Sequence, residues 1–209
     1  MAGYHTIEKR GAGEYDEKKS RFLGEAIPVS SKEEIDAELA RIRKQYFDAR
    51  HHCFAYVLGE KRDNRRFSDD GEPSGTGGMP ILNVIDGEAC TGILIVVTRY
   101  FGGTLLGAGP LARAYGKAAK AALDDAGIVE RKEGAVLQIM LSYAQLDSAL
   151  YLLKQEKIRV DDTAYTDAVA LTCHVPEEEK AALLEKLSAL GRGSIRVNEI
   201  SHGFYGFDT

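Results

Sequence analysis

The segment "TGILIVVTRYFG" at 91–102 constrains the fold most, because its aliphatic and β-branched residues follow one another without a polar break. Such a run is typical of a strand that is covered on both faces, or on one face and one edge. The chain must therefore supply other elements to cover it. With 44% hydrophobic residues in 209, it has enough apolar side chains to build that core.

The elements around this run predict an α/β unit over residues 15–128. Ser31 with Glu34 three residues later forms a capping box in front of an amphipathic helix. Pro110 is well suited to the first turn of a longer helix that stops near Gly127. The other expected elements are strands at 20–29, at 53–60 and in "RRFSDDGE", and a short helix at 79–86.

A second unit follows the charged segment "VERKEG". Its apolar patterns read as strand, helix, two strands, helix and strand, which is the βαββαβ order of ferredoxin-like folds. We therefore expect an α+β protein with two domains, 1–130 and 131–209. The join is expected near Val129–Gly134.

Cysteine usage and hydropathy indicate the compartment. The three cysteines, Cys53, Cys90 and Cys173, are odd in number and widely spaced, which argues for a reducing compartment without disulfides. The N-terminal segment lacks the apolar stretch of a secretion signal, and the run at 92–97 is too short to span a bilayer. We expect a cytoplasmic protein that does not enter a membrane.

The net charge of −5 excludes a molecule that is basic over its whole surface. Binding of a polyanion would need a local patch, for which the candidates are Arg50, Lys61, Arg62, Arg65, Arg66 and Arg113. If about four of these contact phosphates at once, log K should fall with log salt at a slope near −3.

The segment "FSDDGEPSGTGGMPIL" at 67–82 holds three carboxylates and four glycines, which suggests a shaped site. If it lies beside the glycine-rich loop at 102–109, backbone N–H groups and the helix start at Pro110 would form an anion pocket. Arg99 and Arg113 are its candidate anchors. Alternatively, Asp69, Asp70 and Glu72 hold Mg²⁺. An ordinary exposed turn is the favoured interpretation of these three acids.

Two further motifs are weak. "GAGPLA" at 107–112 resembles a dinucleotide fingerprint, but the turn before its helix is too long and no acid follows a second strand. "RHHCFAY" offers His51, His52 and Cys53 for a zinc or nucleophile site. Neighbouring residues of a strand point to opposite faces, so the two histidines diverge, and Cys53 is expected in the core.

Four longer motifs together carry a resemblance to a known family: "KSRFLG", "HHCFAY", "SDDGEPSGTGGMPIL" and "VVTRYFGGTLLGAGPLARAYG". With these motifs the chain resembles the YigZ and IMPACT family, related to translation regulators, over roughly residues 15–127. The resemblance implies that the N-terminal unit folds like the second domain of a small-subunit ribosomal protein. It also implies that the C-terminal unit is similar to C-terminal domains of elongation factor G. Eukaryotic members restrain a translation kinase largely through an additional N-terminal domain. We expect no room for that domain, since the first strand is predicted near residue 20.

The family motif implies a binding surface and no firmly attached reaction, so no catalytic residue is assigned. Its positions here are Asp69, Asp70, Gly71, Glu72, Ser74, Gly75, Thr76, Gly77, Arg99, Gly102 and Gly103, to which we add the basic residues Arg65, Arg66 and Arg113.

Three functions stay open at this point. The first is a non-enzymatic cytosolic factor that regulates translation by binding RNA, the ribosome or a translation-associated protein, without a cofactor. The second is an enzyme that acts on a phosphorylated small molecule or nucleotide with Mg²⁺. The third is a pure protein-interaction module. The first predicts salt-sensitive polyanion binding, the second a saturable nucleotide site, and the third neither.

Overall fold

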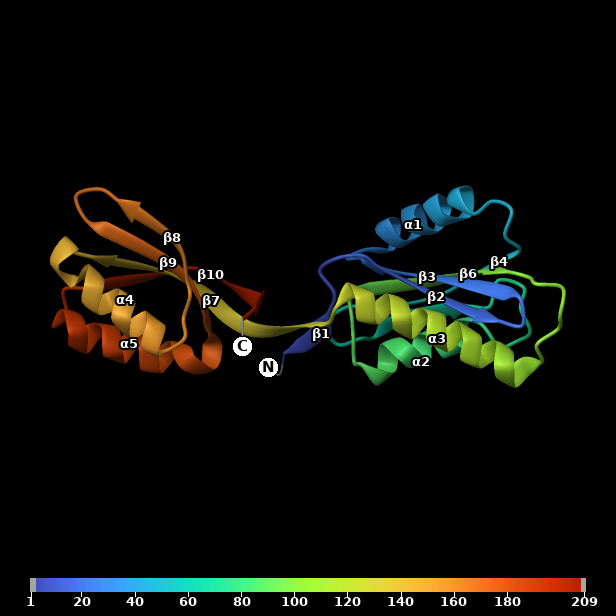
Figure 1. Ribbon diagram of the computed structural model, residues 1–209. Coiled ribbons are helices and arrows are strands. Elements are labelled where there is room, and N and C mark those ends of the chain that lie inside the picture. The colour runs from blue at the N-terminus through green and yellow to red at the C-terminus, as the bar shows by residue number, and fades with distance from the viewer. Residues whose placement is uncertain (1–2, 208–209) are drawn as a thin grey trace. The chain divides into compact units, whose positions relative to one another are not determined.

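The computed structural model describes residues 3–207, which divide into two compact units. One unit is Tyr4–Glu130, and the other contains the chain from Arg131 onward together with Gly3. Both combine an antiparallel sheet with helices, so the protein is a two-domain α+β chain (Figure 1). Among the described helices, none has both the length and the apolar character that crossing a bilayer requires.

The first unit is built on a five-stranded antiparallel sheet in the order β2-β3-β6-β4-β5. The central strand β6 corresponds to the apolar run, and all of its residues except Tyr100 are buried. A short strand β1 (Tyr4–Thr6) precedes the sheet. The five strands are β2 (Gly11–Glu17), β3 (Ser20–Pro28), β4 (His51–Leu58), β5 (Asn64–Ser68) and β6 (Ile93–Tyr100).

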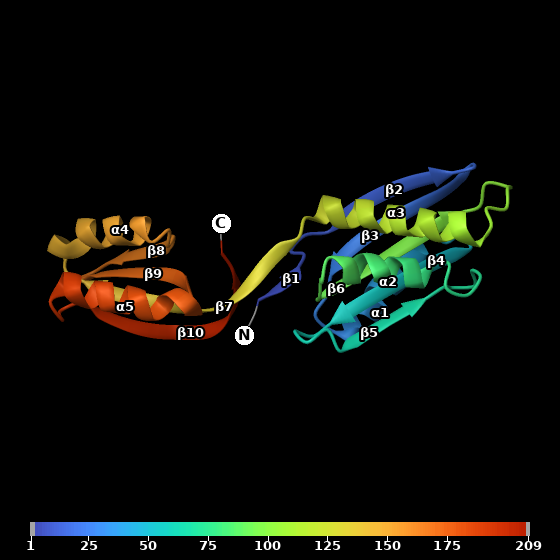
Figure 2. The same ribbon diagram turned by 90° about the horizontal axis from the view of Figure 1, so that it is seen from below.

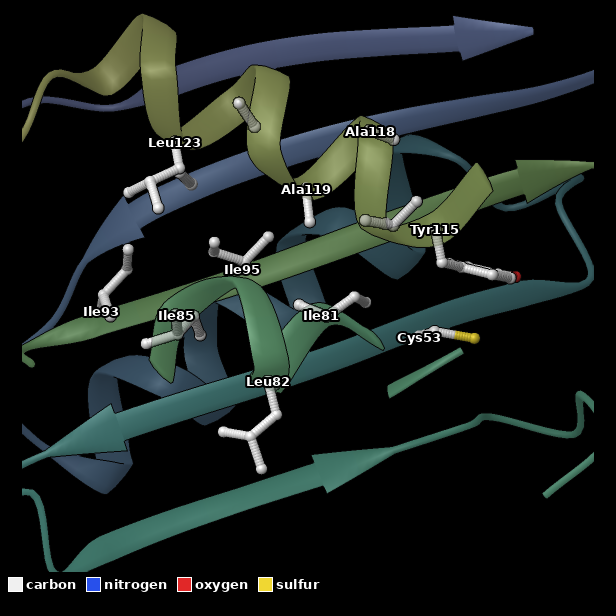
Figure 3. Close-up of a cluster of buried hydrophobic side chains, with 14 of the residues drawn as sticks. Cys53, Ile81, Leu82, Ile85, Ile93, Ile95, Tyr115, Ala118, Ala119 and Leu123 are labelled. Carbon is white, nitrogen blue, oxygen red and sulfur yellow. The ribbon is translucent and has the colours of Figure 1, made fainter. Parts of the chain in front are cut away.

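Helices cover both faces of this sheet, as the buried central strand requires. Helix α1 (Lys32–Gln45) lies on one face, and α2 (Gly78–Gly87) and α3 (Ala108–Ala126) lie on the other (Figures 1 and 2). Figure 3 shows the core under α2 and α3, where Ile81, Ile85 and Ile95 meet. Each such fully buried side chain contributes about 1.5–3 kcal/mol relative to leaving it exposed.

The start of α1 confirms the predicted helix cap. The Ser31 hydroxyl accepts the N–H of Glu34 at 3.2 Å. The Glu34 carboxylate in turn accepts the N–H of Ser30 at 2.7 Å, one residue earlier than a standard capping box would place it. Both contacts satisfy backbone donors that the first turn of a helix leaves without partners.

The second unit has the predicted βαββαβ order. Its strands belong to a five-stranded sheet that also includes β1, and the pairs β10–β7, β7–β9 and β8–β9 are antiparallel. Helices α4 and α5 pack against one face of the sheet and enclose a separate apolar core. A short 3-10 helix η1 (Tyr143–Gln145) precedes α4. The elements are β7 (Val129–Leu141), α4 (Leu146–Gln155), β8 (Val160–Tyr165), β9 (Val169–Pro176), α5 (Glu177–Gly191) and β10 (Arg196–Gly206).

The chain divides between Glu130 and Arg131, inside the segment Val129–Gly134 where the join was expected. This segment is part of a strand, because it forms the first part of β7, and its residues from Arg131 on pair with Phe204–Gly206 and their neighbours in β10. The expectation that the first strand begins near residue 20 was wrong, since β1 and β2 come before it. The sequence did not predict β2, because it contains Gly11 and Gly13 and glycine is a poor strand former. They are needed there because a Cβ on Gly11 would lie 2.2 Å from the Ala122 carbonyl oxygen of α3.

Candidate anion-binding site

The two glycine-rich loops of the first unit meet at one end of its sheet. One loop connects β5 to α2, and the other connects β6 to α3. Between them lies a cavity of about 400 Å³. Its lining residues are Arg50, His51, Glu72, Pro73, Arg99, Phe101, Leu105, Leu106, Gly107, Ala108 and Leu111.

Asp69 organises the first loop. Its carboxylate accepts the N–H groups of Gly75, Gly77 and Gly78 at 2.9, 2.9 and 2.8 Å. Burial alone would raise the pKa of Asp69, but these three backbone donors outweigh it and lower the pKa below its usual range. Two of the three donors are at the start of α2, so Asp69 also caps that helix. The carboxylate is therefore engaged by its own loop.

Glu72 and Arg99 form a buried ion pair in the wall of the cavity. Their side chains are 4% and 7% exposed, and Arg99 Nη1 donates to Glu72 Oε1 at 2.7 Å. The hydroxyl of Tyr115, on α3, donates to the same oxygen at 2.8 Å. Burial raises the pKa of Tyr115 far above its ordinary value, so the phenol stays a neutral donor. The pair joins the first loop to β6 and α3.

Arg99 is held in place by more than Glu72. Its guanidinium lies 5.4 Å from the ring centroid of Phe22 and 5.5 Å from that of Phe101. Nη2 reaches the Ser20 hydroxyl at 3.4 Å. The buried Nε atom has no hydrogen-bond partner among the described residues. The cation is thus fixed in the cavity wall with part of its donor capacity unused.

The two histidines diverge, as the strand geometry predicted. His51 lines the cavity, and its Nδ1 lies 2.9 Å from the carbonyl oxygen of Asp70. His52 is buried, with Nε2 at 3.2 Å from the Tyr46 carbonyl, and its backbone N–H donates to the Asp70 carboxylate at 2.7 Å. Asp70 is also paired with Arg43 at 3.3 Å. Like Asp69, this acid holds local structure together.

Cys53 lies in the core, as expected, at the same end of it as Tyr115 (Figure 3). Burial raises the pKa of its thiol to about 12, and the Sγ atom contacts the Asp69 carbonyl at 3.0 Å. The neutral thiol has little nucleophilic character at physiological pH. Cys53 also explains Gly77, since a Cβ there would lie 2.5 Å from its Sγ atom.

The carboxylates of the first loop do not converge on one point. Asp69, Asp70 and Glu72 each bind a different set of protein groups. Across residues 3–207, no group of three or more His, Cys, Asp or Glu side chains is arranged to hold a metal ion. The arrangement therefore gives the magnesium alternative no shared set of ligands to start from.

The start of α3 faces the cavity through Gly107 and Ala108. Gly107 has φ 78° and ψ 159°, and no side chain caps this helix end among the residues that the structure describes. The sequence predicted that this helix begins at Pro110, but it begins two residues earlier, at Ala108. Helices α1 and α2, by contrast, have Ser31 and Asp69 to accept their first N–H groups. Uncapped N–H groups and the helix dipole attract anions.

The basic residues proposed from the sequence do not all reach this cavity. Arg65 and Arg66 lie on the edge strand β5 and point to opposite faces. Arg65 is near Asp86 at 3.4 Å, whereas Arg66 lies opposite Tyr56, on the α1 face. Arg113 is exposed on α3 and is not among the lining residues. Only Arg99 of the listed basic site residues, together with Arg50 of the wider patch, lines the cavity.

The remaining motif residues shape the two loops. Thr76 donates its hydroxyl to the Pro73 carbonyl at 2.6 Å, and Gly71, Gly75 and Gly103 have positive φ angles. Gly102 packs against Lys19, where a Cβ would lie 2.0 Å from the carbonyl carbon. Ser74 sits in the turn between Pro73 and Gly75. Tyr115 and Ser20 could not be predicted as site residues, because their spacing is that of ordinary core positions and only the fold brings them to Arg99 and Glu72.

Comparisons with known proteins agree with this architecture. The Impact N-terminal domain matches residues 18–123, and a domain of unknown function (DUF1949) matches residues 139–194. The chain is 36% identical over 204 residues to IMPACT family member YvyE of Bacillus subtilis, covering 97% of this chain and 94% of that protein. It is 35% identical to IMPACT family member YigZ of Escherichia coli, covering 86% and 89%.

A solved structure described as a crystal structure of an hypothetical protein superposes with a TM-score of 0.61. The two sequences are 32% identical, and the match covers 96% of this chain and 98% of the other. The match to the Impact N-terminal domain and the two relatives lead to the same assignment, and the chain belongs to the IMPACT family.

Proposed function

We propose that this protein is a cytosolic, translation-associated factor that binds RNA, free or within the ribosome, by placing a phosphate in the cavity at the start of α3. The observation that carries the proposal is the uncapped helix end beside Arg50, His51 and Arg99. The relation of the IMPACT family to translation regulators supports RNA or the ribosome as the source of that phosphate.

The charges of the cavity favour an anion. Its one lining carboxylate, Glu72, is already neutralised by Arg99. Arg50 and the N–H groups of Ala108 and Gly109, at the start of α3, then leave an excess of positive potential. An incoming phosphate would accept these N–H groups in the way that Asp69 accepts those of α2.

The chemistry of the surrounding side chains favours binding over catalysis. The candidate bases Asp69 and Asp70 are engaged by backbone N–H groups, and the thiol of Cys53 is buried and neutral. A general base must reach a substrate proton, and a nucleophile needs an activated form. We therefore place the non-enzymatic function ahead of the enzyme that acts on a phosphorylated small molecule.

The test is a salt titration of the protein with fluorescent single-stranded ribosomal RNA fragments. With about two phosphate contacts, the slope of log K against log salt should be near −1.4, so affinity falls about sevenfold between 50 and 200 mM salt. Arg50→Ala should reduce the slope by about 0.7. Arg66→Ala removes an equally charged, exposed side chain on the α1 face and should change neither the affinity nor the slope. No binding at 50 mM salt, or equal binding by Arg50→Ala and wild type, would refute the proposal.

A further inference from the structure

The cavity is not only cationic, because one side of it is apolar and open to solvent. Phe101 is 48% exposed and Leu105 is 86% exposed, and both line the cavity. Leu106 and Leu111 also line the cavity and are buried. A single exposed apolar residue needs no explanation. An exposed ring and an exposed leucine on the rim of an anion pocket indicate a ligand with an apolar part.

Resting on the function proposed above, we propose that this cavity binds one nucleotide of a single-stranded RNA, with the phosphate at the start of α3 beside Arg50 and the base against Phe101 and Leu105. A nucleotide is the ligand unit of RNA that carries an anion and a flat apolar face within a few ångströms of each other. The two parts of the cavity match these two parts of the ligand.

The ring of Phe101 is held in a position where a base could stack on it. The guanidinium of Arg99 is 5.5 Å from its ring centroid, and Arg99 is itself fixed by Glu72 and by the ring of Phe22. The ring therefore rests on a buried cation while nearly half of its surface stays accessible. Aromatic side chains that are held in this way form the stacking platforms of proteins that bind single-stranded nucleic acids.

Two other aromatic residues nearby do not share this position. The hydroxyl of Tyr100 donates to Asp48 at 2.8 Å, and Tyr100 does not line the cavity. Phe67 is 36% exposed but lies on the edge strand β5, away from the lining residues. Among the described residues, Phe101 is thus the one Phe, Tyr or Trp side chain that borders the cavity.

The size and shape of the cavity favour an unpaired nucleotide over a duplex. A volume of about 400 Å³ lies at the lower end of the range for small-ligand pockets, which suits a single nucleotide. In a duplex the bases are stacked on each other and present only their edges to a protein. A base can reach the face of Phe101 only when it is unpaired.

The experiment compares three probes at fixed salt: a single-stranded RNA of about ten nucleotides, the same strand annealed to its complement, and an abasic strand with the same phosphates. The wild type should bind the single strand about tenfold more tightly than either of the others, as the loss of one stacked base predicts. Phe101→Ala should lower affinity for the single strand about tenfold, to the level of the abasic strand, and Phe101→Tyr should restore it. Phe67→Ala is the matched control and should leave the affinity for all three probes unchanged.

The outcomes separate this inference from the proposed function. If Phe101→Ala melts like the wild type and binds the single strand equally well while Arg50→Ala weakens binding, the phosphate site stands and the base site is refuted. Equal binding of the single strand, the duplex and the abasic strand by the wild type refutes it as well. Salt-sensitive binding of polyglutamate as tight as that of RNA would show an acidic peptide to be the ligand instead. Failure to bind any of the polyanions would refute both proposals.

Discussion

Replacing Glu72 by glutamine should lower the stability of the first unit and at the same time strengthen its binding of anions. Glutamine keeps an oxygen that can accept the hydroxyl of Tyr115, now at 2.8 Å from Glu72 Oε1. The substitution therefore removes mainly the charge. Arg99, whose side chain is 7% exposed, would be left as a buried cation without its counter-ion.

The magnitude follows from this burial. Removing one partner of a buried ion pair costs about 3–5 kcal/mol, because the remaining charge stays desolvated. We expect about 3 kcal/mol for Glu72→Gln, since the hydrogen bond from Tyr115 is retained and the cavity gives Arg99 some access to water. The affinity for anions should increase. A phosphate in the cavity would then meet the full charge of Arg99, so the affinity of Glu72→Gln for single-stranded RNA should exceed that of the wild type.

Urea unfolding followed by circular dichroism measures the first effect, and anisotropy with labelled RNA measures the second. Glu14→Gln is the matched control, because Glu14 also pairs with an arginine, Arg21, but on the exposed surface of β2 and β3. Its effect on stability should be far smaller. Adding Arg99→Met to Glu72→Gln should recover part of the lost stability. A loss no larger than that of Glu14→Gln, or a double variant less stable than Glu72→Gln, would refute the reasoning.

Two further predictions follow from the same site. Asp69→Asn should cost about 1–3 kcal/mol at pH 7, since its carboxylate accepts three backbone N–H groups. Folding lowers the pKa of Asp69, so its contribution to the free energy of unfolding is complete above the unfolded pKa of about 3.9 and is lost as the pH falls through the folded pKa. The stabilities of variant and wild type, measured by urea unfolding, should therefore converge in acid. The thiols of Cys53, Cys90 and Cys173, with pKa values raised by burial to about 12, 11 and 12, should react with an aromatic disulfide reagent at pH 8 only after unfolding. Rapid labelling in native buffer would contradict their placement in the cores.

The sequence predicted the parts of this fold that depend on local pattern. The run at Ile93–Tyr100 predicted a covered central strand, and Ser31 with Glu34 predicted the start of α1. Strand β2 was missed because its glycines serve the close approach of α3, a contact between segments about a hundred residues apart. Local pattern carries no information on such a contact.

The meeting of the two glycine-rich loops could be predicted from the sequence, but their contacts could not. The expectation that the two glycine-rich loops form an anion pocket rested on residue types, and both loops do border the same cavity. The pairing of Glu72 with Arg99 and Tyr115 spans 27 and 43 residues of sequence. A spacing of that length fixes no geometry, so acids that looked available for a metal ion prove to be partners of backbone and side-chain donors.

The basic patch shows why the strength of polyanion binding has to be worked from the structure. The sequence offers six candidate cations, but Arg62 and Arg65 share the carboxylate of Asp86, at 2.5 and 3.4 Å. Of the six, only Arg50 lines the cavity. Arg99, outside these six, is the second cation that lines the cavity. The expected number of phosphate contacts therefore drops from about four to about two, and the slope of log K against log salt changes from near −3 to near −1.4. With so small an ionic contribution in a chain of net charge −5, useful affinity must come from contacts that salt does not screen, and the exposed ring of Phe101 is the group placed to make them. A measured slope near −3 would instead show that cations outside the cavity make about half of the contacts.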